Sequence, residues 1–483
     1  MVKHMVMWSF KEEIPEEKKP ELKAQIKEHL EGLVGVVPGL IKAEVVTDLL
    51  PSSTRDLCLI MDMTKWAVVA CDQFTSQPDY WNETEKIVGD APSTLRIMLP
   101  ELYLDKPDEA ERIASINAHM KEYVEKGVLE NKGEGFAYVV RSVDGKTRKG
   151  LIVALDLENY DYTKGSTTLI RATEGTIVER IPPRLRIRQD APLEMPHILV
   201  LIDDPERTVI EPIGEKLDKT EKLYDFDLMQ KGGHIKGYLV KDEGQIKGAI
   251  DALTALIDKD AYAKKYNTDQ APLLFAMGDG NHSFATAKAN WERIKAEKGL
   301  TAKDEHPARY CLVELENVHD EGIVFEPIHR VIFNVGDKAV EWISNKLTEQ
   351  NGSCEVKNFN SMDELHKAMD GKAGHVIPFV NGKGVGCFYV EHPAAQLEVG
   401  TLQNALDILI KETAGATIDY IHGADVVMDL GTKEGNMGFL LPPMDKSAFF
   451  RTVIFDGALP RKTFSMGEAN EKRYYLECRS ISD

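Results

Sequence analysis

Hydrophobic and polar positions change their spacing within one stretch of the chain, residues 272–295, PLLFAMGDGNHSFATAKANWERIK. Residues 273–277 are apolar and uncharged, and a run of this length favours a short buried strand. Gly278 and Gly280 follow, and glycine permits a sharp turn. Beyond them an apolar stripe recurs at helical spacing, made of Phe284, Ala287, Trp291 and Ile294. The pattern predicts a strand, a tight turn and a helix, with Asn281 as the helix N-cap.

The start of this predicted helix would present the free N–H groups of His282, Ser283 and Phe284, which attract anions and phosphate above all. Asp279 could hold a metal ion there, and His282 could donate a hydrogen bond to a phosphoryl oxygen. A second interpretation stays open, in which the turn is an ordinary glycine-rich connection. Asp279 and Asn281 would then only cap the helix.

Residues 1–62 have a pattern of their own. Strands are predicted at residues 4–10, 41–50 and 57–61, and an amphipathic helix at residues 20–36. The apolar face of that helix consists of Leu22, Ile26, Leu30 and Leu33. The order β-α-β-β is the opening of a ferredoxin-like βαββαβ unit.

The rest of the chain, residues 63–483, mixes both periodicities. Helices are predicted at residues 78–90, 105–126, 245–266, 337–349, 362–369 and 402–413. Strands and turns are predicted at residues 64–74, 136–157 (a hairpin around Asp144-Gly145), 306–334, 353–400 and 436–478. No linker rich in proline, glycine and serine interrupts this region, so we treat it as one interwoven body. The fold class is therefore mixed α/β, or α+β, with residues 1–62 as a separate N-terminal unit.

Composition and charge narrow the class of protein. The chain has 483 residues, of which 43% are hydrophobic and 29% charged, as in soluble globular proteins. Its formal net charge of −20 opposes nucleic-acid binding. The N-terminus lacks the features of a signal peptide, and no apolar stretch has the length of a membrane span, so we expect a cytoplasmic protein without a membrane partner. The cysteines form no C-x-x-C pair and favour reduced thiols: Cys58, Cys71, Cys311, Cys354, Cys387 and Cys478.

Three arginines alternate with other residues in the segment PPRLRIR. If this segment is a strand, Arg184, Arg186 and Arg188 share one face with successive guanidinium groups about 6–7 Å apart. Arginine cannot lose its charge, so such a row needs an anion or nearby carboxylates. One alternative is an anion-binding row. The other is a structural ladder of ion pairs with Glu174, Glu179 or Glu194.

Other candidate groups follow predicted strands. Asp203 and Asp204 end the apolar run HILVLI, where they would suit Mg²⁺ or simply an exposed turn. Glu326 precedes the basic pair His329-Arg330 and could serve as a general base, as a phosphate-binding residue or as part of a structural network.

The C-terminal segment LPRKTFSMGEANEKR contains a second basic element. Arg461 and Lys462 precede Ser465-x-x-Glu468, which has the spacing of a capping box. This spacing predicts a helix start with Ser465 as a cap rather than a nucleophile, and a second anion-binding element formed with the basic pair. The chain has no phosphate-binding loop of the G-x-x-x-x-G-K-[ST] type and no G-x-S-x-G elbow.

Residues 1–62 resemble the stress-responsive dimeric α/β barrel family through VKHMVMWSFK, VVPGLIKAEV and SSTRDLCLIMDM. In that family two copies pair their sheets into a barrel, which implies a homodimer through these residues. The second helix and last strand of the family pattern are missing after Met63. We therefore expect a partial barrel unit.

Residues 63–483 resemble a family known as domain of unknown function number 1015. The matching stretches are WAVVACDQFTSQPDYW, LIRATEGT, RIPPRLRIR, APLEMPH, GDGNHSFATAK, HPARY, FEPIHR and PRKTFSMGEANEKRYYLECR. The central stretch is similar to the phosphate-contacting D-G-H-H-R motif of the ParB/sulfiredoxin-like superfamily. Asp279, Gly280 and His282 match that motif, whereas Asn281 replaces its first histidine and Ser283 its arginine.

That superfamily includes nucleotide-binding DNA-partition proteins, sulfiredoxin and free-serine kinases. Sulfiredoxin chemistry needs a cysteine beside the motif, and none lies near His282. A partition protein needs a basic surface, whereas this chain is acidic. A small-molecule kinase needs a phosphate cradle, carboxylates for Mg²⁺ and cationic groups, and the chain has candidates for each.

The resemblance and the motifs together predict an ATP-dependent phosphotransferase acting on a small hydroxylated metabolite, with free L-serine as the acceptor that the resemblance implies. The expected catalytic residues are Asp279, His282, Glu326 and Glu194, one of the two glutamates being the base. The expected phosphate-binding residues are Gly278, Gly280, Asn281, Ser283, Arg184, Arg186, Arg188, Arg461 and Lys462. The expected Mg²⁺ ligands are Asp279, Asp203 and Asp204. The alternatives are a non-catalytic nucleotide or metabolite sensor, and a phosphate-ester hydrolase or isomerase.

Overall fold

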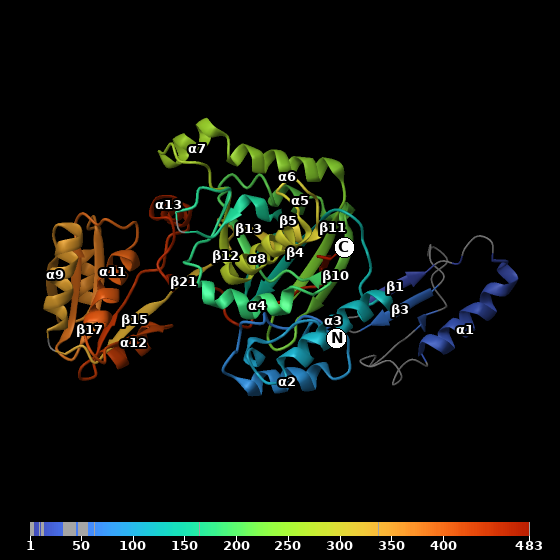
Figure 1. Ribbon diagram of the computed structural model, residues 1–483, viewed down its shortest axis with the longest axis horizontal. Coiled ribbons are helices and arrows are strands. Elements are labelled where there is room, and N and C mark those ends of the chain that lie inside the picture. Colours follow the sequence, from blue (N-terminus) through green and yellow to red (C-terminus); the bar gives the residue numbers. More distant parts are fainter. Residues whose placement is uncertain are drawn as a thin grey trace.

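The computed structural model describes residues 4–8, 10, 14–31, 45–46, 57–61, 63–163, 165–336 and 338–482. It has a mixed α/β fold with three larger sheets, as Figure 1 shows. The N-terminal sheet lies at one end of the molecule, a nine-stranded sheet in the middle and a six-stranded sheet at the other end (Figure 1). The expected fold class is confirmed.

The N-terminal unit contains β1 (His4–Trp8), α1 (Lys19–Glu31), β2 (Val45–Val46) and β3 (Leu57–Met61). The strands are antiparallel in the order β1-β3-β2. This confirms the predicted order of one strand, one helix and two strands. Most of the strand predicted at residues 41–50 and the C-terminal part of the helix predicted at 20–36 lie outside the described residues.

The central sheet has the strand order β10-β11-β4-β5-β13-β9-β12-β7-β6. Its strands are β4 (Phe136–Val143), β5 (Lys146–Asp156), β6 (Tyr160–Asp161), β7 (Ile170–Arg171), β9 (Leu199–Ile202), β10 (Glu221–Asp227), β11 (His234–Val240), β12 (Phe275–Asp279) and β13 (Tyr310–Asn317). The hairpin β4–β5 turns at Asp144-Gly145, as its sequence predicts.

Both faces of the central sheet are covered. On β5, Leu151 packs in the same buried cluster as Trp291 of α8 (Asn281–Lys298), whereas its neighbour Ile152 packs with Trp66 in a second cluster. Successive strand residues point to opposite faces, so a strand covered on both sides needs apolar residues at consecutive positions. The apolar run at residues 273–277 has this pattern for the same reason.

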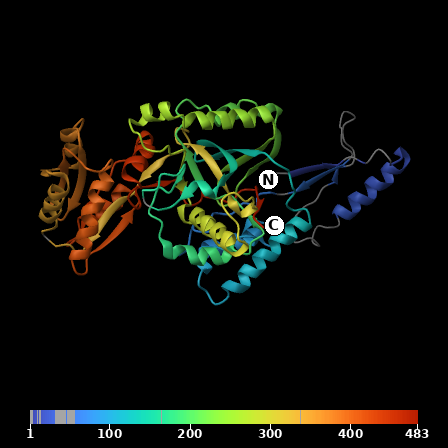
Figure 2. The ribbon, with the colours of Figure 1, turned by 45° about the horizontal axis from the view of Figure 1, so that its top comes forward.

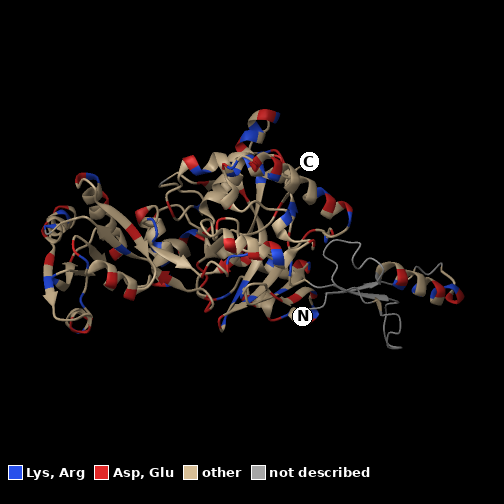
Figure 3. Cartoon of the chain, turned by 90° about the horizontal axis from the view of Figure 1, so that it is seen from below, with Lys and Arg blue, Asp and Glu red and all other residues tan. Residues whose placement is uncertain are grey.

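The remaining helices of this part flank the sheet. They are α2 (Pro78–Val88), α3 (Glu109–Glu125), α4 (Ile181–Arg188), α5 (Glu211–Gly214), α6 (Glu243–Leu256) and α7 (Lys259–Tyr266). Helices α6 and α7 lie on one side of the molecule and α2 and α3 on the other (Figure 1, Figure 2). None of the helices in the described part of the chain combines the length and apolarity of a membrane span. Acidic and basic side chains are interspersed along these elements (Figure 3).

The second large sheet has the order β16-β18-β17-β20-β15-β19 and is antiparallel throughout. Its strands are β15 (His329–Phe333), β16 (Glu355–Phe359), β17 (His375–Asn381), β18 (Gly384–Val390), β19 (Thr417–Ile421) and β20 (Met437–Phe439). Its helices are α9 (Ala339–Asn351), α10 (Met362–Met369), α11 (Glu398–Glu412) and α12 (Ala424–Gly431), followed along the chain by α13 (Lys446–Asp456).

The C-terminal segment returns to the central sheet. Strand β21 (Phe464–Met466) pairs with β14 (Phe325–Pro327), and β22 (Arg479–Ser480) pairs with β8 (Leu193–Glu194). One buried cluster also joins residues of the two large sheets, such as Ala276 and Phe379. Residues 64–74 form turns with an isolated bridge between Val69 and Arg473, not the predicted strand. The C-terminal segment thus brings distant residues to the end of β12.

Candidate anion-binding site at the start of helix α8

The predicted strand, turn and helix are present as β12, Gly280 and α8. Gly280 occupies the N-cap position with φ of +83°, and a Cβ atom there would lie 3.1 Å from Cγ1 of Ile198. Glycine fits both the positive φ and the close approach. The prediction that Asn281 caps the helix is therefore wrong, because Asn281 is the first helical residue.

Asn281 instead ties a neighbouring segment to the turn. Its side-chain oxygen accepts a hydrogen bond from the N–H of Thr173 at 3.0 Å. The hydroxyl of Thr173 donates to the carbonyl of Met277 at 2.6 Å. These bonds hold the segment LIRATEGT beside the end of β12, so that Glu174 lies next to the helix start.

The helix start presents three backbone donors. The first N–H of α8 with a backbone acceptor is that of Phe284, which donates to the carbonyl of Gly280 at 3.0 Å. The N–H groups of Asn281, His282 and Ser283 have no acceptor within the described part of the chain. Unsatisfied N–H groups at a helix start, together with the helix dipole, attract anions.

His282 lies beside these donors as a neutral ring. Its Nε2 accepts a hydrogen bond from the N–H of Ile177 at 3.2 Å, which leaves the ring proton on Nδ1. Burial, followed by the positive charges of Arg180 and Arg184, lowers the pKa of His282 to about 4. His282 therefore provides a hydrogen-bond donor and no charge at neutral pH.

Two cations near His282, Arg180 and Lys462, form no ion pair with a described carboxylate, although the charge of Lys462 acts on Glu174 and that of Arg180 on Glu101. Arg180 and Lys462 are both exposed, and both lower the pKa of His282 by their charge. Neither forms an ion pair with a described carboxylate, in a chain whose net charge is −20. Positive charge therefore accumulates beside the free N–H groups, which favours a bound anion.

Acidic residues complete the surroundings of the helix start. Asp279 accepts from the N–H of Gly280 at 2.8 Å and forms an ion pair with Lys472 at 2.8 Å. Burial alone would lower the pKa of Lys472, but Asp279 raises it, so this lysine is charged. Burial raises the pKa of Glu174, against the lowering effect of Lys462 and with a further rise from Asp279. Asp72 also acts by its charge on His282.

Ser283 is held by a second histidine. Its hydroxyl lies 2.9 Å from Nε2 of His197, whose ring lies 4.9 Å from that of Tyr474. Burial lowers the pKa of His197, so this ring is also neutral at neutral pH. The Ser283 side chain is thus oriented beside its own free backbone N–H.

The three arginines of the segment PPRLRIR lie on a helix, α4, and not on the predicted strand. Pro182 and Pro183 occupy the first helical turn, where proline is favoured. Residues two apart on a helix point in different directions. The prediction of an anion-binding row on a strand is therefore wrong. Each arginine instead forms ion pairs: Arg184 with Glu101 at 2.6 Å, Arg186 with Glu109 at 2.8 Å and Asp105 at 2.7 Å, and Arg188 with Glu194.

Glu194 is a structural residue of a buried network. It pairs with Arg188 and with Arg479, and it accepts the N–H of Leu312 at 2.9 Å. Burial favours its neutral form, but the two guanidinium groups hold the pKa of Glu194 below its ordinary value. Glu194 is buried inside this network, whereas Asp279 is partly exposed, so Glu194 is not placed to take a substrate proton.

The three predicted Mg²⁺ ligands do not meet. Strands β9 and β12 are antiparallel, and Asp279 lies opposite Leu199 at the start of β9, whereas Asp203 and Asp204 follow its end. Asp203 contacts Tyr266, Lys265 and His319, and Asp204 accepts the N–H groups of Thr208 and Val209. No group of three metal-ligating side chains is found among the described residues. The expectation that Asp279 shares one metal site with Asp203 or Asp204 is therefore wrong.

The two residues of the C-terminal basic pair, Arg461 and Lys462, have different neighbours. Ser465 lies in β21 and its hydroxyl donates to the carbonyl of Gly467 at 3.1 Å, so the predicted capping box and helix start are wrong. Arg461 pairs with Asp407, whereas Lys462 joins the site at α8. Glu326 lies opposite Ser465 and faces a separate cavity.

Four residues of this site were not among the predicted site residues: Asp72, Glu174, Arg180 and Lys472. Each belongs to or adjoins a stretch that carries the family resemblance. No local periodicity distinguishes them, because their role depends on contacts between segments far apart in the chain. The signal that the sequence did contain is their position within the stretches that carry the family resemblance.

Comparisons with known proteins agree with both resemblances. Residues 59–409 match the family model described as "Protein of unknown function (DUF1015)", and residues 2–96 match the model of the stress responsive A/B barrel domain. A search of curated proteins found no match.

Several solved structures show a distant likeness. A conserved hypothetical protein from Pyrococcus furiosus has 12% identity and a TM-score of 0.31, over 65% of this chain and 90% of that chain. A free serine kinase in complex with AMP has 11% identity and a TM-score of 0.33, over 68% and 91%. SbnI from Staphylococcus aureus, with a C-terminal truncation, has 8% identity and a TM-score of 0.31, over 65% and 82%.

Proposed function

The chain belongs to the DUF1015 family, and we propose that it is an ATP-dependent phosphotransferase acting on a small hydroxylated metabolite. One observation carries the proposal: free N–H groups, a neutral His282 and the unpaired cations Arg180 and Lys462 converge at the start of α8. Phosphoryl transfer depends mainly on positioning and on stabilising charge, and this arrangement supplies groups for both.

The polyphosphate would bind at the helix start. The N–H groups of residues 281–283 and Nδ1 of His282 would donate hydrogen bonds to phosphate oxygens. Arg180 and Lys462 would neutralise the negative charge from the exposed side. Lys472, held by Asp279, would add a third positive charge from the buried side.

The residues at the helix start could supply one carboxylate ligand to a nucleotide-bound Mg²⁺ ion. Nucleotide-bound Mg²⁺ needs only one or two protein carboxylates besides phosphates and water. Asp279 at the helix start would be that ligand, and the carboxylate of Glu174 is close enough to act on it by charge. The ion would supply further neutralisation of charge on the phosphates.

We assign the proton acceptor to Glu174. Its raised pKa makes it a stronger base than an ordinary carboxylate at neutral pH. In the proposed step the substrate hydroxyl oxygen forms a bond to the γ-phosphorus, the bond from that phosphorus to the oxygen of ADP breaks, and Glu174 takes the hydroxyl proton. Free L-serine is the acceptor to test first, because the motif at residues 278–283 resembles a superfamily that includes free-serine kinases.

Phosphorus NMR of the purified protein with Mg-ATP and a pool of free amino and hydroxy acids tests the proposal. We expect a new phosphomonoester resonance with an equal amount of ADP, and fractionation of the pool then identifies the acceptor. Consumption of phosphate esters without ATP would instead support a hydrolase or isomerase. Binding of ATP with no product would contradict the proposal and support a sensor.

Glu174→Gln tests the assignment of the base. Because the amide cannot accept the proton, turnover should fall by about 100-fold or more while ATP binding stays within about twofold. Glu179→Gln is the matched control, since Glu179 is exposed in the same segment. Equal turnover in the two variants would rule out Glu174 as the base.

A further inference from the structure

Ser283 has a feature that the proposed transfer to a metabolite does not use. Its hydroxyl lies 2.9 Å from Nε2 of His197, and its own N–H is one of the three at the start of α8 that have no acceptor in the described chain. A serine hydroxyl within hydrogen-bond reach of a histidine is the arrangement of an activated nucleophile. Ser283 is partly exposed and lies where the phosphates would bind.

His197 is suited to take up the proton of this hydroxyl. Burial lowers the pKa of His197, so its ring is neutral at neutral pH and has one nitrogen without a proton. With the ring proton on Nδ1, Nε2 accepts the hydrogen bond from the serine hydroxyl. Asp72, the backbone of Met195 and Asp279 each raise the pKa of this ring, and Arg188 acts against them. The two carboxylates therefore stabilise the imidazolium ion that proton uptake produces.

Packing fixes the position of His197 relative to the helix start. His197 directly precedes Ile198, and a Cβ atom on Gly280 would lie 3.1 Å from Cγ1 of Ile198. The segment before β9 therefore lies directly against the turn that begins α8. The ring of Tyr474 lies 4.9 Å from the imidazole ring on the C-terminal side of the site. These contacts hold the imidazole beside the Ser283 hydroxyl.

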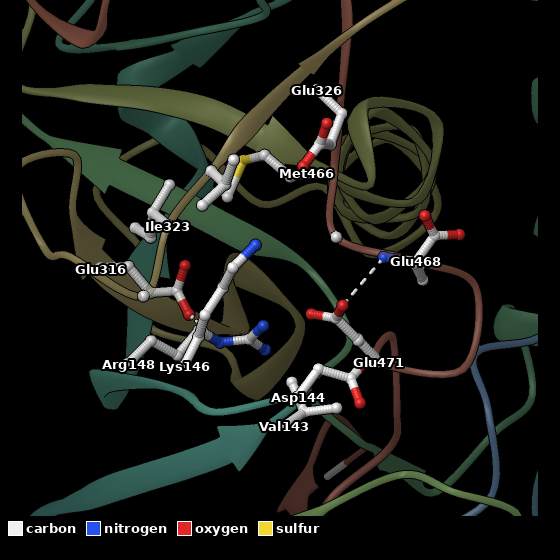
Figure 4. Close-up of a pocket in the computed structure, with 13 residues that line it drawn as sticks. Val143, Asp144, Lys146, Arg148, Glu316, Ile323, Glu326, Met466, Glu468 and Glu471 are labelled. Atoms are coloured by element: carbon white, nitrogen blue, oxygen red, sulfur yellow. Dashed lines mark hydrogen bonds and ion pairs between the residues drawn. The ribbon is translucent and has the colours of Figure 1, made fainter. Parts of the chain in front are cut away.

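Two other hydroxyl groups beside the end of β12 instead donate to backbone carbonyls. Thr173 donates to the carbonyl of Met277 at 2.6 Å, and Ser465 donates to that of Gly467 at 3.1 Å. The residues that follow Ser465, 466–468, line the separate cavity of about 130 Å³ beside the β4–β5 hairpin (Figure 4). A carbonyl oxygen accepts a hydrogen bond but is no base at neutral pH. The imidazole partner therefore distinguishes Ser283 from these two hydroxyl groups.

We propose that the chain phosphorylates its own Ser283 when no acceptor metabolite is bound, with His197 as the base. This inference rests on the proposed phosphotransferase function, because it uses the γ-phosphoryl group of the same bound ATP. In this step, Oγ of Ser283 forms a bond to the γ-phosphorus, and the bond from that phosphorus to the bridging oxygen of ADP breaks. ADP keeps the electron pair of the broken bond, and the hydroxyl proton passes to Nε2 of His197.

The helix start would stabilise the phosphoserine that forms. Negative charge in the first turn of a helix is favoured by the helix dipole and by free N–H groups. The N–H groups of residues 281–283 and the cations Arg180 and Lys462 lie there. The phosphoserine would occupy the donors that ATP needs, so the phosphorylated chain should bind Mg-ATP more weakly than the unmodified chain.

Mass spectrometry of the full chain tests the proposal after incubation with Mg-ATP, with and without the pool of free amino and hydroxy acids. Without the pool, we expect a single phosphoryl group on the peptide that contains Ser283, placed on that residue by fragmentation. With the pool, this modification should decrease, because the metabolite competes for the same phosphoryl group. The wild-type chain alone gives this result, so the test does not depend on the folding of a variant.

Two variants and a control identify the reacting groups. Ser283→Ala should lose the modification of this peptide. His197→Asn should slow the modification by about 100-fold, because a positioned base contributes at least that factor. Ser465→Ala is the matched control, since Ser465 lies on the neighbouring segment and donates to a carbonyl, and it should be modified at the wild-type rate.

The outcomes separate this inference from the function on which it rests. A phosphorylated metabolite in the pool, with Ser283 unmodified in its absence, would overturn self-phosphorylation and leave the proposed function intact. A phosphoryl group on neither the pool nor the chain would overturn both. Modification of a different residue, or the wild-type rate in His197→Asn, would also overturn the inference.

Discussion

Helices α4 and α8 pack against each other. The charged side chains on α4 are paired, whereas two cations beside the start of α8 are not. The arginines of α4 are each paired with carboxylates, and Arg188 is part of a buried network with Glu194. Beside the start of α8 lie Arg180, the N-cap residue of α4, and Lys462, which act by charge on Glu101 and Glu174 but form no ion pair with a described carboxylate. The comparison shows that a conspicuous arginine motif can consist of structural ion pairs, and it is the unpaired cations that we propose as binding groups.

The comparison predicts which variants lose activity and which lose stability. Paired groups should affect the free energy of unfolding, and unpaired groups should affect ligand binding. The predictions below follow in order of expected effect.

His282→Ala should give the largest effect, a loss of turnover of about 100- to 1000-fold, because it removes a donor aimed at the phosphates. Thermal unfolding should change little. Since the pKa of His282 is about 4, the turnover of the wild type should show no loss from titration of this ring between about pH 5 and pH 8. His119→Ala, on the exposed side of α3, is the control. Full turnover in His282→Ala would end the site assignment.

Glu194→Ala should lower the free energy of unfolding by about 3–5 kcal/mol, because it leaves Arg188 buried without its partner. Denaturant unfolding followed by circular dichroism measures this. Glu179→Ala, an exposed glutamate beside α4, should change it by less than about 0.5 kcal/mol. A similarly small effect of Glu194→Ala would mean that the α4 network is not structural.

Glu316 extends the comparison to a buried carboxyl group that shares one cation, Arg148, with Glu314. Its pKa is about 8 in the folded chain and about 4.5 in the unfolded chain, so the folded state holds an extra proton between these values. Stability should therefore fall as the pH rises from about 4.5 to 8, and Glu316→Gln should reduce this fall. Urea unfolding at about pH 5.5 and about pH 8 measures it. An unchanged pH dependence in the variant would contradict the raised pKa of Glu316.

Ser465→Ala should have the smallest effect, about 0.5 kcal/mol in the free energy of unfolding, because Ser465 caps no helix and loses only one part-buried hydrogen bond, to the carbonyl of Gly467. Loss of an N-cap would cost about 1 kcal/mol. Thermal unfolding distinguishes the smaller effect from the larger one. A decrease of the larger size would indicate that Ser465 caps a helix after all.

The sequence predicted elements well where one local pattern determines the structure. The strand, turn and helix at residues 272–295 followed from apolar spacing and glycine, and helix α10 was predicted with its bounds. Prediction from the sequence failed where one pattern is compatible with two kinds of secondary structure. The arginines at period two suit a strand, but Pro182 and Pro183 begin a helix, and that signal should have outweighed the spacing.

The site was predicted only in part for a related reason. Asp279, His282 and Ser283 could be predicted as neighbours because they lie together on one turn. Lys472 reaches Asp279 from the C-terminal segment, and no local pattern could show this contact. The assignment of Asp203 as a partner of Asp279 failed because β9 and β12 are antiparallel, a property of the sheet rather than of either strand.

The central claim is that unpaired cations at the start of α8 bind phosphate, and its most direct test is the affinity for Mg-ATP by calorimetric titration. The double variant Arg180→Ala with Lys462→Ala should bind at least about tenfold more weakly than the wild type, because two charge-assisted contacts are lost. Arg186→Ala removes an arginine of the same region that is already paired, and it should leave the affinity within about twofold. Equal affinity in the double variant and the wild type would contradict the account.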